Sequence, residues 1–148
     1  MVTQRIREHT AALSLAAAAV CLVVTRACLQ NITIDEATSY LLYASASREH
    51  FSSPWYPSSG NHVLNSLLMR LVTLVFGVSE LTVRIPAILG ALIYIGSALY
   101  LCLLITGRKL LQLPLLMCLI YNPVILDYLV AARGYSLAIG FLLAAIAL

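Results

Sequence analysis

The chain has 148 residues, of which 61% are hydrophobic and 10% are charged, and its formal net charge is +3. A soluble domain normally carries about 25% charged residues to cover its surface, so this composition excludes an ordinary soluble globular domain and predicts that lipid solvates much of the chain. The small net charge and the scattered arginines exclude a nucleic-acid interface.

Residues 11–29 form the first predicted membrane span. Their one charged residue, Arg26, lies near the end, where its side chain reaches the headgroups. Arg5 and Arg7 precede the span, and the positive-inside rule places them and the N-terminus in the cytoplasm. A cleaved signal peptide is the alternative. We favour a retained anchor, because the apolar run is long and no clear A-x-A site follows it.

An outer loop with interfacial helices is predicted over residues 30–86. Residues 36–47 have helical spacing, and the Ser- and Pro-containing runs at 52–60 then break the chain. Residues 62–76 are short for a span and contain Arg70, which at the bilayer centre costs about 2.5–3.5 kcal/mol. We therefore expect 62–76 to lie in or near the outer interface.

Residues 87–106 are uncharged and form the second predicted span, which Pro86 opens near the helix start. Arg108 and Lys109 follow directly, and they lie in the cytoplasm only if residues 62–76 do not cross the membrane. The charge pattern thus supports the interfacial assignment.

The next span is predicted at 110–126, with Asn122-Pro123 kinking its outer end. The apolar run at 137–148 is too short for a complete span, so we expect the chain to be the N-terminal part of a longer protein, cut inside a helix. The predicted fold is all-α, a multi-spanning integral membrane helical bundle forming a single domain in the cell (inner or plasma) membrane.

Two adjacent carboxylates, Asp35 and Glu36, follow the first span on the predicted outer side. Such a pair serves as a general base, or binds a divalent metal or a sugar hydroxyl. The alternative is local structure, since Thr33-x-x-Glu36 fits a helix capping box. The four cysteines form no CxxC pair and none lies at ligand spacing from a histidine, so no zinc site is indicated.

Further polar residues are predicted on the same side of the membrane, and each has a plain structural alternative. His62 begins an interfacial helix and suits a phosphate or a carboxylate. Arg84 suits an anionic substrate group such as a phosphate, and the alternatives are anchoring at the interface or an ion pair with Glu80 four residues earlier. Asp127 and Arg133 are ionisable residues near membrane depth, and a guanidinium suits a phosphate ester.

The order of these elements resembles a known family. One span is followed by Asp35-Glu36-Ala37, then by Asn61-His62-Val63-Leu64, by Phe76-Gly77-x-Ser79-Glu80-Leu81-x-x-Arg84-Ile85-Pro86, and by Ala132-Arg133-Gly134-Tyr135-Ser136-Leu137. This arrangement resembles the N-terminal half of GT-C-fold glycosyltransferases, the group of protein mannosyltransferases, aminoarabinose transferases and RgtA/B/C/D-like enzymes. The resemblance runs from about residue 11 to the end of the chain.

The resemblance implies a multi-pass enzyme that uses a polyprenyl-phosphate-linked sugar as donor. It makes Asp35 the candidate base and Glu36 its neighbour, and it matches His62, Arg133 and Tyr135 to residues near the substrate. Relatives often have His-Pro-Pro where this chain has His-Val-Leu, and an acid before Ala-Arg where this chain has an alanine. Asp127 is the candidate replacement for that acid.

The sequence therefore favours a glycosyltransferase that moves a sugar to an acceptor hydroxyl of a glycan, lipid or protein, with inversion at the anomeric carbon. We expect the chain by itself to lack part of the donor site and to be inactive. A transporter or flippase for lipid-linked intermediates is one alternative, although the predicted spans contain few polar residues. A non-catalytic membrane assembly subunit is the other.

Overall fold

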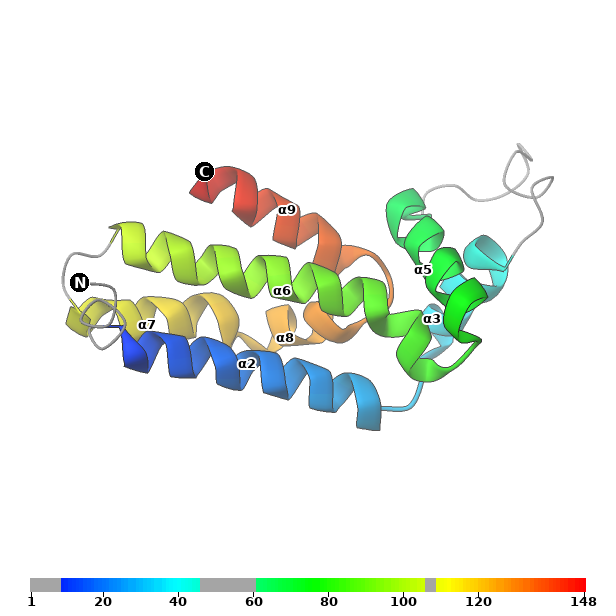
Figure 1. The fold of residues 1–148 in the computed structure, drawn as a ribbon, viewed down its shortest axis with the longest axis horizontal. Coiled ribbons are helices and arrows are strands. Elements are labelled where there is room, and N and C mark those ends of the chain that lie inside the picture. The colour runs from blue at the N-terminus through cyan, green and yellow to red at the C-terminus, as the bar shows by residue number, and fades with distance from the viewer. Residues whose placement is uncertain (1–8, 46–60, 106–108) are drawn as a thin grey trace.

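The computed structural model describes residues 9–45, 61–105 and 109–148, and all regular structure in these ranges is helical. The predicted all-α class is confirmed for this part of the chain. Figure 1 shows long helices lying side by side, with shorter helices gathered at one end. The elements are α2 (Thr10–Leu29), α3 (Ile34–Ser39), the π-helical turn η1 (Tyr40–Ala44), α5 (Val63–Phe76), α6 (Glu80–Ile105), α7 (Lys109–Ile120), α8 (Pro123–Val130) and α9 (Tyr135–Ala147).

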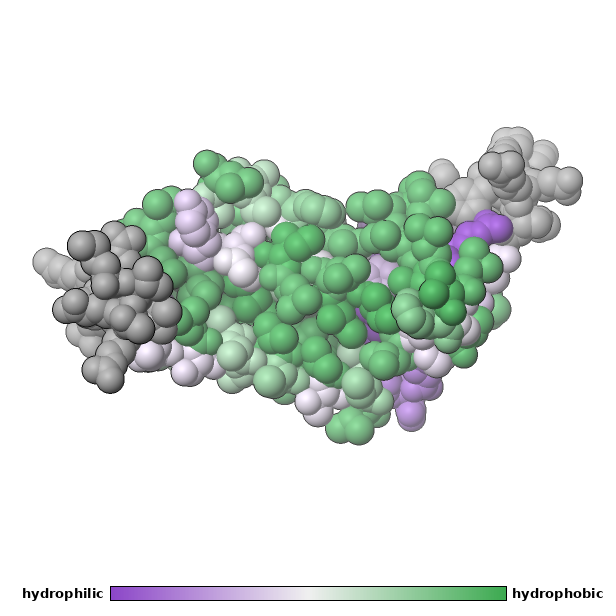
Figure 2. All heavy atoms as spheres, in the orientation of Figure 1, coloured by the Kyte–Doolittle hydropathy of each residue, from purple (hydrophilic) through white to green (hydrophobic). Residues whose placement is uncertain are grey.

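Two helices, α2 and α6, are each long and apolar enough to cross a membrane. The pair α7 and α8 passes the same test only when taken together, and the two are bent by 56° relative to each other. Helices α5 and α9 are apolar but shorter. Figure 2 shows hydrophobic side chains along most of the coloured surface, while the most hydrophilic ones lie towards the end that holds α3 and α5. This distribution suits a chain that is embedded in lipid.

Helix α6 begins earlier than the sequence predicts, at Glu80 instead of residue 87, and Pro86 lies inside it. The cause is a cap at Ser79. The Ser79 Oγ accepts a hydrogen bond from the backbone N–H of Thr82 at 3.1 Å, and the Thr82 Oγ1 accepts one from the backbone N–H of Ser79 at 2.8 Å. This reciprocal cap starts the helix six residues before Pro86. Arg84 consequently belongs to α6 and not to the preceding loop.

The predicted span at 110–126 is two helices, because the chain breaks at Asn122-Pro123 as predicted. The Asn122 side chain accepts a hydrogen bond from the Val124 N–H at 3.0 Å, and Pro123 opens α8. A proline has no N–H, so the carbonyl of Leu119 lacks its usual partner four residues on. The Tyr94 hydroxyl donates to that carbonyl at 2.8 Å, which satisfies it from α6.

Small residues let the long helices approach closely. Alanines form most of the buried face of α2, which packs against α6. Between α6 and α9 the contact is closer still: a Cβ on Gly90 would come within 2.5 Å of the backbone N of Leu137, and a Cβ on Gly140 within 2.7 Å of the Gly90 carbonyl. Close backbone approach of this kind is typical of helices that associate in lipid.

The polar end of the bundle holds α3, η1 and α5 beyond the end of α2 (Figure 1). The helix predicted at 36–47 begins two residues earlier and becomes π-helical from Tyr40 to Ala44. The predicted helix at 62–76 is present as α5, with Gly77 at its C-cap. The predicted break at 52–60, as well as Arg5, Arg7 and Arg108, lies outside the described residues.

Candidate functional site

A buried ion pair joins α3 to α6. The Arg84 Nε donates to the Glu36 Oε1 at 2.9 Å, and the Arg84 Nη2 donates to the Glu36 Oε2 at 2.8 Å. Each residue is only 1% exposed. The two parallel bonds form the fork geometry that fixes a guanidinium against a carboxylate. The sequence prediction of a pair between Arg84 and Glu80 missed this contact, which joins residues far apart in the chain.

The remaining donors of Arg84 bind the end of α2. Its Nη1 donates to the carbonyl of Ala27 at 3.1 Å and to that of Gln30, and its Nη2 donates to the carbonyl of Asn31 at 3.0 Å. A guanidinium has five N–H groups, and all five are used. We therefore correct the prediction that Arg84 binds substrate: in this structure it has no donor left for a ligand, and it ties three chain segments together.

Glu36 is equally saturated. Its Oε2 accepts hydrogen bonds from the Thr33 backbone N–H at 2.9 Å and from the Thr33 hydroxyl at 3.0 Å, and its Oε1 accepts one from the Ala132 N–H at 3.0 Å. Thr33 completes the capping box that the sequence offered as the structural alternative. Burial by itself raises the pKa of this carboxyl, but the bonds from Arg84, Thr33 and Ala132 outweigh it and lower the pKa to about 2. Glu36 is thus a fixed anion inside the fold.

The loop between α8 and α9 is held from two sides. The N–H of Ala132 binds Glu36, and the carbonyl of Ala132 accepts a hydrogen bond from the Asn65 Nδ2 at 3.3 Å. Gly134 then turns the chain with φ +82°, and a Cβ there would come within 2.5 Å of the His62 Cβ. A left-handed backbone and this close approach both require glycine. These contacts fix the backbone that carries Arg133 beside the start of α5.

Arg133 forms an exposed ion pair with Asp35. Its Nη1 lies 2.7 Å from the Asp35 Oδ2, and the two side chains are 38% and 62% exposed. The adjacent carboxylates of α3 are therefore in different environments: Glu36 points into the fold and Asp35 points outward. The sequence predicts Asp35 and Arg133 on the same side of the membrane, and the structure brings the two side chains into contact.

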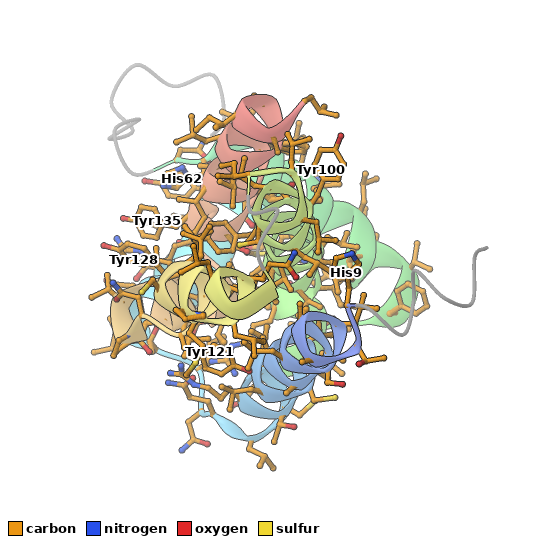
Figure 3. All side chains as sticks on the ribbon, turned by 90° about the vertical axis from the view of Figure 1, so that its left-hand side faces the viewer. His9, His62, Tyr100, Tyr121, Tyr128 and Tyr135 are labelled. Carbon is orange, nitrogen blue, oxygen red and sulfur yellow. The ribbon has the colours of Figure 1, made fainter. Side chains whose placement is uncertain are left out.

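An aromatic cluster lies beside this ion pair. The ring centroids of Tyr135 and His62 are 5.1 Å apart, those of Tyr135 and Tyr128 are 4.9 Å apart, and the Arg133 guanidinium lies 5.3 Å from the Tyr135 centroid. Figure 3 shows His62, Tyr135 and Tyr128 following one another along one side of the molecule. The sequence analysis singled out His62 and Tyr135 but not Tyr128, which the bend between α7 and α8 brings to the cluster.

Asp127 pairs with Arg26 of α2 and not with Arg133, which follows it six positions later in the chain. Its Oδ1 lies 2.6 Å from the Arg26 Nη2, and the side chains are 66% and 30% exposed. Arg26 was predicted only to reach the headgroups. The pair stands at a cavity of about 260 Å³ between the end of α2, the start of α3 and α8, with Gln30 and Val130 also in its wall. Asp127 is therefore near the first-loop carboxylates but on a separate ion pair.

The predicted site residues thus fall into three groups. Glu36 and Arg84 form a buried structural pair, Asp35 and Arg133 form an exposed pair beside His62 and Tyr135, and Asp127 pairs with Arg26. Among the described residues no group of three or more His, Cys, Asp or Glu side chains is arranged to hold a metal ion. No family model, no curated protein and no solved structure matches the chain.

Proposed function

We propose that the protein is a glycosyltransferase that moves a sugar from a polyprenyl-phosphate donor to an acceptor hydroxyl at the extracytoplasmic face of the cell membrane. One observation carries the proposal: the exposed Asp35 carboxylate lies 2.7 Å from the Arg133 guanidinium, at the polar end of an apolar helical bundle. The reaction needs a proton acceptor and a phosphate-binding cation close together, and these two groups meet both needs.

In the proposed reaction, Asp35 accepts the proton of the acceptor hydroxyl while that oxygen bonds to the anomeric carbon. The bond between the anomeric carbon and the phosphate oxygen breaks, and the polyprenyl phosphate leaves with the electron pair. Arg133 binds the phosphate and stabilises the charge that grows on it. Attack from the side opposite the phosphate inverts the anomeric configuration, and no oxidant or reductant is needed.

Asp35 and Arg133 must separate from each other to bind substrate, and their exposure makes this easy. Exposed ion pairs contribute only about 0–1 kcal/mol, and both side chains are more than a third exposed. The neighbouring rings of Tyr128 and Tyr135 offer faces on which a sugar ring stacks. The buried pair of Glu36 and Arg84 supports the site from behind, because Glu36 holds the loop that carries Arg133.

The proposal includes a topology. The protein is a multi-pass membrane protein with its N-terminus in the cytoplasm, and α3, α5 and the start of α9 lie at the outer surface. Its partners are a lipid-linked sugar donor, an acceptor that carries a free hydroxyl, and the surrounding lipids. A Cys introduced at Ser58, in a background without the native cysteines, should react with an impermeant thiol reagent added from outside the cell.

The test is a transfer assay on membranes from cells in which the native gene encodes Asp35→Asn, so that the protein is studied as the cell makes it. A panel of radiolabelled polyprenyl-phosphate sugars serves as donor. We expect the variant to lose at least 100-fold in transfer while it inserts in the membrane normally, because loss of a positioned general base typically costs 10²–10⁴-fold.

The matched control is Glu80→Gln, which neutralises another exposed carboxylate at the same polar end. It should retain transfer. If Asp35→Asn also retains it, Asp35 has no part in the chemistry. If the wild-type membranes transfer none of the sugars, the reading as a non-catalytic assembly subunit is favoured, since the capping box and the buried ion pair would serve such a subunit equally well.

A further inference from the structure

The cavity beside Arg26 and Asp127 is separate from the Asp35–Arg133 ion pair. Neither Asp35 nor Arg133 lines it, although Glu36 and Ala131, which are close to them in sequence, do. Helices α7 and α8 are bent by 56° at Asn122-Pro123, and Asp127 on α8 meets Arg26 on α2 beside the cavity. The proposed transfer chemistry uses none of the residues at the cavity mouth.

Few of the lining groups are available to a ligand. Glu36 and Arg84 are part of the wall, but each is 1% exposed and its hydrogen-bonding groups are already used. Thr33 also lines the cavity, but its hydroxyl is bonded to Glu36. The groups that remain are the guanidinium of Arg26, 30% exposed, the carboxylate of Asp127, 66% exposed, and the amide of Gln30, which is also exposed. They offer hydrogen-bond donors and acceptors together.

The charges at the mouth balance. Asp127 repels an anionic ligand, and Arg26 repels a cationic one, so neither a phosphate nor an amine is matched by the whole set. A neutral polyol matches the whole set, because each of its hydroxyls both donates and accepts. Planar guanidinium, carboxylate and amide groups bind neighbouring hydroxyls in pairs. Val130 and Ala131 supply an apolar part of the wall for the C–H face of a ring.

The size of the cavity limits the ligand further. Its volume of about 260 Å³ is below the roughly 300–1,000 Å³ of pockets that hold drug-sized molecules. One pyranose ring suits this space, whereas an oligosaccharide or a polyprenyl chain does not. Size, charge and hydrogen-bonding groups all indicate the same class of ligand.

We propose that this cavity binds a single neutral sugar ring, held by Arg26, Asp127 and Gln30. The inference deepens the proposed function and rests on it only for the role of the ring, which is a sugar unit of a glycan acceptor whose reacting hydroxyl lies outside this cavity. Binding itself needs no transfer. Arg26 and Gln30 are then residues that determine acceptor specificity and that the sequence analysis did not identify as a site.

Saturation-transfer difference NMR on the purified chain tests the proposal, in a detergent that contains no sugar. The probes are the methyl α-pyranosides of glucose, mannose and galactose. We expect at least one of them to bind the wild-type protein, and we expect Asp127→Asn and Arg26→Gln each to weaken that binding at least fivefold. Both side chains are partly or largely exposed, so neither change should unfold the protein, which circular dichroism checks.

Glu80→Gln is the control, because Glu80 is an exposed charged residue that lines neither the cavity nor the Asp35–Arg133 ion pair, and it should leave pyranoside binding unchanged. Inorganic phosphate should not compete. Three results would overturn the proposal: no pyranoside binds the wild type, binding survives in both cavity variants, or phosphate displaces the probe and Arg26→Gln alone weakens binding, which indicates an anion site. Pyranoside binding without sugar transfer would refute the proposed function and leave this inference standing.

Discussion

Replacing Glu36 with glutamine should destabilise the fold strongly, because it leaves the Arg84 guanidinium buried without a counter-charge. Both residues are 1% exposed, so solvent does little to screen the loss. Removing one partner of a buried ion pair typically costs about 3–5 kcal/mol. The lowering of the Glu36 pKa from 4.5 to about 2 corresponds to a similar amount, about 3 kcal/mol at 1.36 kcal/mol per unit.

The assay is the free energy of unfolding in lipid bicelles, measured for Glu36→Gln, for Arg84→Met and for the double variant. We expect the double variant to lose less than the sum of the single ones, because it leaves no unpaired charge. It should remain less stable than the wild type, since the carbonyls of Ala27 and Asn31 lose their donor. Asp35→Asn is the control, and its exposed pair should contribute less than about 1 kcal/mol.

The same pair predicts a dependence on pH. The Glu36 pKa is lower in the folded state, at about 2, than its ordinary value of 4.5, so the unfolded chain binds a proton first as the pH falls. The stabilisation is therefore complete above pH 4.5 and is lost as the pH falls towards 2. Glu36→Gln should lack this part of the pH profile. The reasoning is refuted if this variant unfolds within about 1 kcal/mol of the wild type, or if the two pH profiles coincide.

Two pairs of glycines provide the remaining predictions, each with its own control. Gly77→Ala has open space around its Cβ and should cost only the strain of its positive φ, about 1–3 kcal/mol. Gly134→Ala should cost more than Gly77→Ala, because the overlap with the His62 side chain adds to about 1–2 kcal/mol for its left-handed backbone. A loss at Gly134 no larger than that at Gly77 in thermal unfolding would refute the role of the overlap. Gly90→Ala should cost about 1–3 kcal/mol by forcing α6 from α9, whereas Gly96→Ala on the same helix, with nothing near its Cβ, should be neutral or slightly stabilising. Disulfide crosslinking between cysteines introduced into α6 and α9 should fall in Gly90→Ala and not in Gly96→Ala.

Local features of the fold were predictable because local chemistry determines them. The apolar run at 11–29 indicated α2, and Asn122-Pro123 indicated the break before α8. The spacing of Thr33 and Glu36 indicated a capping box, and the structure has one. The start of α6 was predicted wrongly because proline is common in the first helical turn, and the Ser79 cap upstream was overlooked.

The contacts that build the candidate site leave no comparable pattern in the amino-acid sequence. Arg84 and Glu36 are 48 positions apart, and Arg26 and Asp127 are 101 apart. Helical spacing indicates only partners about one turn away in the sequence, such as Glu80 for Arg84. Only the packing of α2, α3, α6 and α8 brings these charges together. A capping box explained Glu36 from sequence, but its burial against a guanidinium was visible only in three dimensions.

Tyr94 and Pro123 depend on each other, because the Tyr94 hydroxyl pairs the carbonyl that Pro123 leaves without a donor. A partly buried carbonyl without a partner is costly, so Pro123 is tolerated in this chain because α6 supplies a donor to the carbonyl of Leu119. Divergent descendants should therefore keep both residues or exchange both. A homologue without the proline would join α7 and α8 into one straight helix and move Asp127 away from Arg26. Its residue at position 94 would then be free to vary.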